Sequence, residues 1–171
     1  MKTIHEQLGI PKAYGHSPTL PRYADAEELV DVGPNIIGRM QRLTPATAKA
    51  WGEMQAAAAA ESFDLLIVSG FRSIDDQARL IWNKLCEGQS IETILKVNTA
   101  PGYSQHHTGR AIDIATPGVR PLTEPFDESP AFQWLDANAE TFGFRMPYGY
   151  NNDWGLTYEP WHWFMTEEFD Q

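Results

Sequence analysis

The sequence predicts an α+β domain, in which a small antiparallel sheet is flanked by helices. Short apolar runs rich in branched side chains indicate buried strands, and longer segments with capping residues indicate helices between them. These segments lack the regular strand-helix-strand spacing of a parallel sheet. The chain has 171 residues, 42% of them hydrophobic, which is enough for one compact core and too few for two ordinary domains.

The beginning of the chain differs from the remainder. Residues 1–43 contain scattered proline and glycine with weak periodicity, so we expect an irregular arm packed on a domain formed by residues 44–171. The domain opens with a typical helix start, because the Thr44 hydroxyl can cap a helix and Pro45 suits its first position. The alanine-rich run up to Glu61 has high helix propensity.

The middle of the chain predicts a strand and two helices. Residues 64–69 are a short apolar run suited to a buried strand, and Gly70 turns the chain out of it. Ser73 then caps a second helix, whose apolar residues recur at helical spacing as far as Leu85. Residues 90–97 predict a shorter helix.

The last third predicts one more helix and the remaining strands. Residues 110–115 alternate as a strand does. Ser129, followed by proline, begins a helix with an apolar stripe, and Gly143 is well placed to end it. Residues 143–146 and 161–165 are expected to form a second strand pair.

Charge and cysteine content exclude several classes of partner and site. A formal net charge of -10 argues against DNA or RNA, because counterion release needs clustered Lys and Arg. The absence of an apolar run long enough for a signal peptide or a membrane span leads us to expect a cytoplasmic protein without a membrane partner. Cys86 is the only cysteine, which excludes an internal disulfide and an all-thiolate zinc site. Nothing in the sequence indicates an oligomeric state.

His106, Asp113 and His162 are the most informative residues, with Glu159 shortly before the last of them. An aspartate flanked by isoleucine on both sides in a strand carries a large desolvation cost unless a cation or several donors neutralise it. Two imidazoles and one carboxylate also leave the fourth position of tetrahedral zinc open, as in catalytic sites. We therefore expect a catalytic metal site.

Glu159 has a different expected role. Pro160 keeps it out of a helix and biases it to extended geometry, so its carboxylate can approach the metal without binding it. A carboxylate in that position can take a proton from water that attacks a carbonyl and deliver it to the leaving amine. That role is typical of peptide or amide hydrolysis.

Arg72 leaves the predicted strand at a tight turn beside a helix start. From there a guanidinium could reach a polarised carbonyl oxygen or a substrate carboxylate, and Gln77 lies near the beginning of the same helix. Both residues could instead make local hydrogen bonds at the surface. For Arg72, the structural alternative is a salt bridge with Asp75 or Asp76.

These residues lie in three motifs, at residues 69–73, 104–113 and 159–162. Between about Leu65 and Phe164 the chain resembles the VanY-type zinc D-alanyl-D-alanine carboxypeptidases. The wider group includes D-Ala-D-Ala dipeptidases, lysostaphin-like endopeptidases and the hedgehog signalling domain. The resemblance implies a fold of the hedgehog and D-Ala-D-Ala peptidase type.

The resemblance also implies roles for individual residues. Glu159 would be the general base, Arg72 would stabilise the developing oxyanion, and Gln77 and Ser104 would help to hold the C-terminal carboxylate of the substrate. One Zn²⁺ ion per chain is implied. Its ligands would be His106, Asp113 and His162.

Some assignments stay open. Either His106 or His107 could be the ligand, and spacing to Asp113 favours His106. Trp161 and Trp163 could line a substrate groove, although aromatic residues that alternate in a strand more often belong to the core.

The loop at residues 148–154 has polar and aromatic side chains that suit a groove wall, and turn chemistry alone would also explain it.

The expected function is that of a zinc carboxypeptidase that removes the C-terminal D-alanine from peptidoglycan-derived peptides. The preferred version is an L,D-carboxypeptidase acting on tetrapeptides in cell-wall recycling, because trimming pentapeptide precursors inside the cell would damage new wall. A D,D-carboxypeptidase and a D-Ala-D-Ala dipeptidase are the enzymatic alternatives. A non-catalytic zinc-containing binding module is the alternative of another class, and the presence of Glu159 and Arg72 argues against it.

Overall fold

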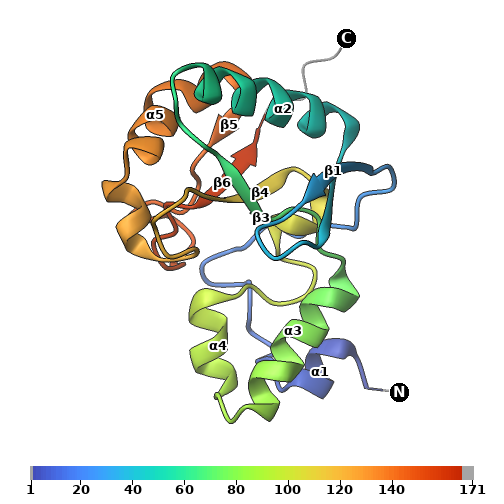
Figure 1. The fold of residues 1–171 in the computed structure, drawn as a ribbon. Coiled ribbons are helices and arrows are strands. Elements are labelled where there is room, and N and C mark those ends of the chain that lie inside the picture. Colours follow the sequence, from blue (N-terminus) through green and yellow to red (C-terminus); the bar gives the residue numbers. More distant parts are fainter. Residues whose placement is uncertain (1, 167–171) are drawn as a thin grey trace.

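The computed structural model describes residues 2–166 and consists of two small sheets with helices around them (Figure 1). The helices are α1 (Ile4–Leu8), α2 (Pro45–Ala60), α3 (Ile74–Cys86), α4 (Ile91–Val97) and α5 (Pro130–Asn138). Short 3-10 helices are η1 (Gln105–Thr108), η2 (Glu124–Glu128) and η3 (Ala139–Phe142). The strands are β1 (Val30–Pro34), β2 (Met40–Leu43), β3 (Leu66–Ser69), β4 (Ala111–Ala115), β5 (Phe144–Arg145) and β6 (His162–Met165).

The larger sheet has four strands in the order β3-β4-β6-β5, and all of its pairs are antiparallel. The α+β prediction is confirmed. In the central pair, Asp113 lies opposite His162, and on the other side of β4 it lies opposite Ser69. This register brings residues far apart in the sequence to the same level of the sheet.

Two apolar clusters support the fold. The larger cluster joins the four-stranded sheet to α2 and α5, and Trp51, Met54 and Phe144 are among its fully buried side chains. The second joins α1, α3 and α4, with Ile81 and Ile94 fully buried. In Figure 1, α3 and α4 lie at the opposite end of the molecule from α2 and α5. The site lies between these two ends.

Local sequence signals placed the main helices correctly. The hydroxyl of Thr44 accepts from the N–H of Thr47 at the start of α2, and that of Ser73 accepts from the N–H of Asp76 at the start of α3. Gly143 follows η3 with a left-handed φ of 84°, which glycine adopts without strain. The predicted strands at residues 143–146 and 161–165 correspond to the paired β5 and β6.

The arm at residues 1–43 is less irregular than expected. It contains α1, which begins with a capping box at Thr3, and the β1–β2 hairpin. The prediction of an irregular segment was wrong there, because these short elements are fixed by contacts with the domain as well as by local signals. The arm packs on the domain, and the N–H groups of Tyr23 and Ala26 donate to the carbonyls of Gly102 and His107.

Residues 167–171 of the predicted domain lie outside the described residues. Within residues 2–166, no helix combines the length and the apolar character needed to cross a bilayer.

Candidate active site

His106, Asp113 and His162 converge on one buried point, where one ligand atom from each residue lies within 4.8 Å of the others. His106 Nε2 lies 3.2 Å from Asp113 Oδ2, and His162 Nδ1 lies 2.9 Å from Asp113 Oδ1. Strands β4 and β6 supply Asp113 and His162 through their register, and η1 supplies His106. The predicted ligand set is therefore brought together by the fold.

Hydrogen bonds to the remaining ring nitrogens fix how the two imidazoles face this point. His106 Nδ1 lies 2.7 Å from the carbonyl oxygen of Gly70, and His162 Nε2 lies 2.9 Å from Oε1 of Gln105. Both partners are acceptors, so these nitrogens carry the protons. The lone pairs of His106 Nε2 and His162 Nδ1 are then directed at the Asp113 carboxylate.

This arrangement fits a divalent metal ion. Burial lowers the pKa of His106, which favours its neutral form. Burial opposes ionisation of Asp113, and without metal only positive charge and hydrogen bonds from the two imidazoles would hold its pKa well below the usual range; a bound cation supplies that charge while the rings stay neutral. Lone pairs that face a carboxylate repel it unless a cation lies between them. Ligand bonds of about 2.0–2.1 Å at tetrahedral angles place ligand atoms roughly 3.3 Å apart. The two ring nitrogens lie 3.2 and 2.9 Å from the Asp113 oxygens, close to that spacing.

Gln105 is a functional residue that the sequence analysis did not identify. Its side chain is 3% exposed and holds His162 in the tautomer that can bind metal. A partner of this kind orients the ring and raises its basicity as a ligand. Its place beside His106 in the second motif was the available signal, but its contact with His162 spans 57 positions of sequence.

Replacing Gln105 with alanine should lower zinc affinity by about 10- to 100-fold, because His162 loses the acceptor that orients it. Competition with a chromogenic chelator measures this change. Gln105→Glu keeps an acceptor oxygen and should restore most of the affinity, and Gln133→Ala on the exposed face of α5 serves as the matched control. Equal zinc affinity in Gln105→Ala and Gln133→Ala would show that the contact does not orient the ligand.

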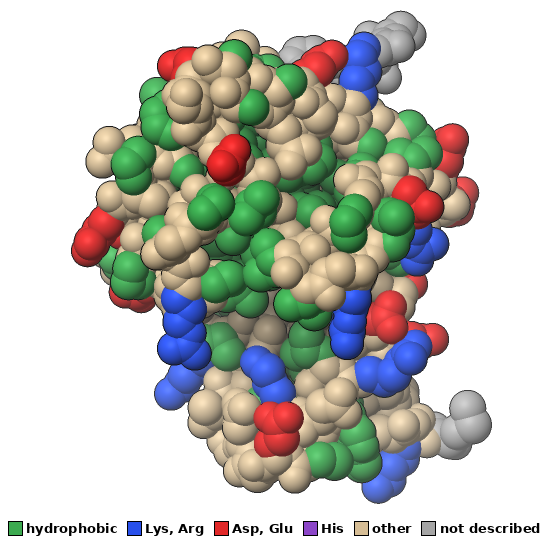
Figure 2. All heavy atoms as spheres, viewed as in Figure 1, with side chains coloured by type: hydrophobic (Ala, Val, Ile, Leu, Met, Phe, Trp, Pro, Cys, Tyr) green, Lys and Arg blue, Asp and Glu red, His purple; other side chains and the backbone are tan. Residues whose placement is uncertain are grey.

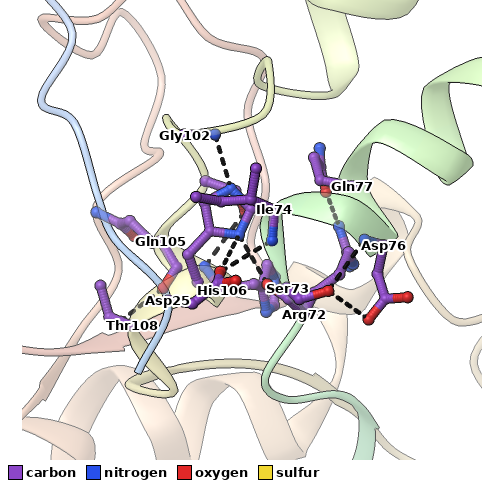
Figure 3. A network of polar contacts seen from close by, with 12 residues as sticks. Asp25, Arg72, Ser73, Ile74, Asp76, Gln77, Gly102, Gln105, His106 and Thr108 are labelled. Carbon is purple, nitrogen blue, oxygen red and sulfur yellow. Dashed lines mark hydrogen bonds and ion pairs between the residues drawn. The ribbon is translucent and has the colours of Figure 1, made fainter. Parts of the chain in front are cut away.

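The choice between His106 and His107 is resolved in favour of His106. His107 is fully buried, its Nδ1 donates to the carbonyl of Arg72 at 2.7 Å, and its Nε2 accepts from the N–H of Gly102 at 3.0 Å. Both nitrogens are therefore used in holding the backbone around the site. Figure 3 shows the polar contacts of this region, in which Gly102 and His106 lie beside Arg72 and the start of α3.

Glu159 lines the same cavity as the three ligands, in the segment that leads into β6. Burial raises its pKa to about 7, with Asp113 acting in the same direction and His162 and Arg72 opposing. The positive charge of a bound metal ion would lower this pKa. A carboxyl group that titrates near neutrality can both accept and return a proton.

Arg72 is half-buried and held by two side chains. Its Nη1 donates to Gln77 Oε1 at 2.8 Å, and its Nη2 donates to Ser69 Oγ at 3.0 Å. Figure 3 shows Arg72 directed toward Gln77. Burial lowers the pKa of Arg72, while Asp113 and Glu159 oppose this shift. The guanidinium is thus fixed between the metal ligands and α3, with further N–H groups left to donate.

The alternative salt bridge for Arg72 is not formed. Asp76 pairs instead with Arg79, at 3.1 Å. Gln77 is buried and its Nε2 also donates to the carbonyl of Thr99, so it anchors Arg72 to the chain that follows α4. Ser104 lines the cavity and its hydroxyl accepts from the N–H of His106. The substrate-binding roles of Gln77 and Ser104 stay predictions.

The site opens into a cavity of about 470 Å³. Figure 2 shows a hollow between the sheet-containing end and the α3–α4 end, bordered by Lys and Arg side chains. Tyr148 and Trp161 line the cavity, and Trp161 also packs against the larger apolar cluster. Trp163 is buried in that cluster, as expected of a core residue. Tyr148 also stacks on His162, with ring centroids 4.7 Å apart, which supports the groove-wall interpretation of its loop.

The fold and the site define a class: an α+β domain of the metallopeptidase type, in which the described residues bring two histidines and an aspartate together as a candidate metal site. The motifs at residues 104–113 and 159–162 supply all three of the expected metal ligands. The chain belongs to the VanY family of D-alanyl-D-alanine carboxypeptidases, whose family model matches residues 40–167.

Similar proteins support the assignment. YodJ of Bacillus subtilis (strain 168) is 31% identical over 173 residues, which cover 95% of this chain and 62% of YodJ. The chain thus spans about three fifths of the length of this relative.

Two solved structures share the fold. The LdcB LD-carboxypeptidase is 30% identical with a TM-score of 0.73, covering 85% of this chain and 71% of that one. A Zn(II) complex of the D,D-pentapeptidase VanY from a VanB-type resistance cassette is 23% identical with a TM-score of 0.66, covering 86% and 83%.

Proposed function

We propose that this protein is a zinc carboxypeptidase that removes the C-terminal D-alanine from peptidoglycan stem peptides. The observation that carries the proposal is the convergence of His106, Asp113 and His162 with Glu159 beside them in one open cavity. Zinc is favoured because two imidazoles and a carboxylate are typical ligands of its catalytic sites. Membership of the VanY family supports D-alanine as the residue removed.

Hydrolysis follows from what each side chain can do. Bound zinc would supply Lewis acidity, which polarises the scissile carbonyl and makes water more acidic. Glu159 takes the proton from the attacking water and passes it to the nitrogen of the leaving D-alanine. Arg72 donates N–H groups to the carbonyl oxygen as negative charge develops on it, and its bonds to Gln77 and Ser69 keep it in place beforehand.

Within the family, we favour an L,D-carboxypeptidase that acts on tetrapeptides. The support is the similarity to LdcB, at 30% identity and a TM-score of 0.73. The D,D-pentapeptidase is only 23% identical and supports the shared fold alone. We also propose a cytoplasmic role in wall recycling, because trimming tetrapeptides returned from turnover would spare the pentapeptide precursors. Fractionation of cells that produce the tagged protein tests this location.

Product analysis on defined stem peptides tests the bond that is cleaved. We expect D-alanine and tripeptide from the tetrapeptide, little cleavage of the pentapeptide, and loss of activity when a chelator removes the metal. Mass spectrometry of tripeptide, tetrapeptide and pentapeptide reactions, with and without chelator and with zinc added back, measures all three. Exclusive cleavage of the pentapeptide would contradict the L,D assignment and leave the D,D alternative.

The same reactions separate the remaining alternatives. A D-Ala-D-Ala dipeptidase would release D-alanine from the free dipeptide and leave the tetrapeptide intact. A zinc-containing binding module would bind stem peptides without cleaving any of them. The half-buried Arg72 and the raised pKa of Glu159 favour a hydrolytic site over such a module.

A further inference from the structure

The N-terminal arm bonds to two segments beside the metal site through neighbouring residues. Oδ1 of Asp25 accepts from the N–H of Ile74, the first residue of α3, at 2.9 Å. The N–H of Ala26 donates to the carbonyl of His107 in η1 at 2.8 Å. Figure 3 shows Asp25, Ile74 and Arg72 in one network of polar contacts. The family model matches residues 40–167, so these arm residues lie outside the matched region.

His107 links the same segments from the interior. Its ring is fully buried, with Nδ1 2.7 Å from the carbonyl oxygen of Arg72 and Nε2 3.0 Å from the backbone nitrogen of Gly102. A neutral imidazole has one N–H and one lone pair, so it satisfies that carbonyl with the first and that N–H with the second. The carbonyl of Gly102 in turn accepts from the N–H of Tyr23 in the arm at 2.8 Å. His107 thus connects the arm-bound chain at Gly102 to the backbone of Arg72.

Arg72 is consequently held at its backbone as well as at its side chain. Its N–H donates to the carbonyl of His106 at 3.1 Å, and its carbonyl accepts from His107. Two residues further along the chain, Asp25 holds Ile74. A side chain can be placed no more accurately than the backbone that carries it, and a displacement of about 1 Å at a reacting centre can cost roughly 100-fold in rate. These contacts therefore bear on the reaction, because Arg72 must face the carbonyl oxygen before charge develops on it.

We propose that Asp25 and His107 are positioning residues for Arg72, and that the N-terminal arm belongs to the catalytic framework through them. This inference rests on the proposed carboxypeptidase function and extends it to residues outside the cavity. Neither Asp25 nor His107 lines the cavity, so each acts through the backbone rather than on the substrate. Asp25 fixes the start of α3 from the arm, and His107 fixes the carbonyl of Arg72 from the core.

Double-mutant cycles with Arg72 test this role. His107→Phe keeps a ring but removes both nitrogens, and it should lower kcat on the tetrapeptide roughly 10- to 100-fold with KM changed less than about threefold. Arg72→Met should itself lose about 10²- to 10³-fold in kcat. In that background His107→Phe should cost less than about threefold, because no guanidinium is left to position. His107→Gln supplies an N–H and a carbonyl oxygen and should restore most of kcat.

Asp25→Ala tests the arm at a position away from the metal ligands. It should lower kcat by about three- to tenfold, again only while Arg72 is present, and Asp25→Asn should restore most of kcat because it keeps an acceptor oxygen. Asp31→Ala is the matched control, because it removes the same side chain from an exposed position on β1 of the same arm. Zinc content and melting temperature ensure that kcat is compared among folded, metal-loaded enzymes.

Either of two results would overturn the inference. One is wild-type kcat in folded, zinc-loaded His107→Phe or Asp25→Ala, and the other is an equal fold-loss with and without Arg72. If His107→Phe does not fold, Asp25→Ala decides alone. A wild-type enzyme that releases D-alanine from none of the stem peptides would instead overturn the proposed function, and the positioning role with it.

Discussion

Replacing Glu159 with glutamine should lower kcat for D-alanine release by roughly 10²- to 10⁴-fold. The amide keeps the size of the side chain but cannot take a proton from water. Zinc binding should be retained, because the ligands are His106, Asp113 and His162 rather than Glu159. Steady-state kinetics on the tetrapeptide, together with zinc content by atomic spectroscopy, measure the two effects separately.

Glu53→Gln, on the exposed surface of α2, provides the matched control and should leave kcat unchanged. The acidic limb of the wild-type pH profile gives a second readout of the same group. Activity should rise with pH as Glu159 loses its proton, with a midpoint below the value of about 7 expected without metal. If Glu159→Gln hydrolysed the tetrapeptide as fast as Glu53→Gln, another group would have to be the base.

Replacing Asp113 with asparagine should remove tight zinc binding and reduce hydrolysis to background. The substitution nearly preserves shape but leaves two neutral imidazoles without the anionic ligand between them. Zinc at about 1,000 times its Kd stabilises a protein by roughly 4 kcal/mol, or on the order of 10 °C in Tm for a domain of this size. Thermal melts with and without zinc should show this increment in the wild type only.

Asp136→Asn, on the exposed face of α5, is the control for loss of a carboxylate. It should keep both the zinc-dependent rise in Tm and the activity. A full zinc-dependent increment in Asp113→Asn would place the metal elsewhere in the protein.

The parts of the fold that local chemistry specifies could be predicted from the sequence. Thr44, Ser73 and Gly143 mark helix ends through their side chain or backbone freedom, and the structure places them there. The ligand set was also accessible, because an aspartate within an apolar strand requires compensation wherever the strand lies. The position of Glu159 beside the ligands followed from its proline neighbour and the family motif.

Features that depend on contacts between distant segments, or on very short strands, could not be predicted from the sequence. The β1–β2 hairpin is a local pairing, but its strands are short, and only Val30-Asp31-Val32 alternates, so the pattern was too brief to predict it. The contact between Gln105 and His162 depends on two segments that only the folded sheet brings together. Lys84 is an ordinary surface residue by helical pattern, and its place in the cavity depends on how α3 and α4 pack.

The pairing of Asp113 with His162 across β4 and β6 has a consequence for how the protein matures. A slip of one residue between these strands would turn one of the two side chains to the opposite face and break the ligand set. A metal ion that needs both side chains would therefore bind correctly paired chains more tightly and lower their free energy relative to misaligned ones. Metal binding during folding would thus stabilise chains in which β4 and β6 are correctly aligned over chains in which they are shifted.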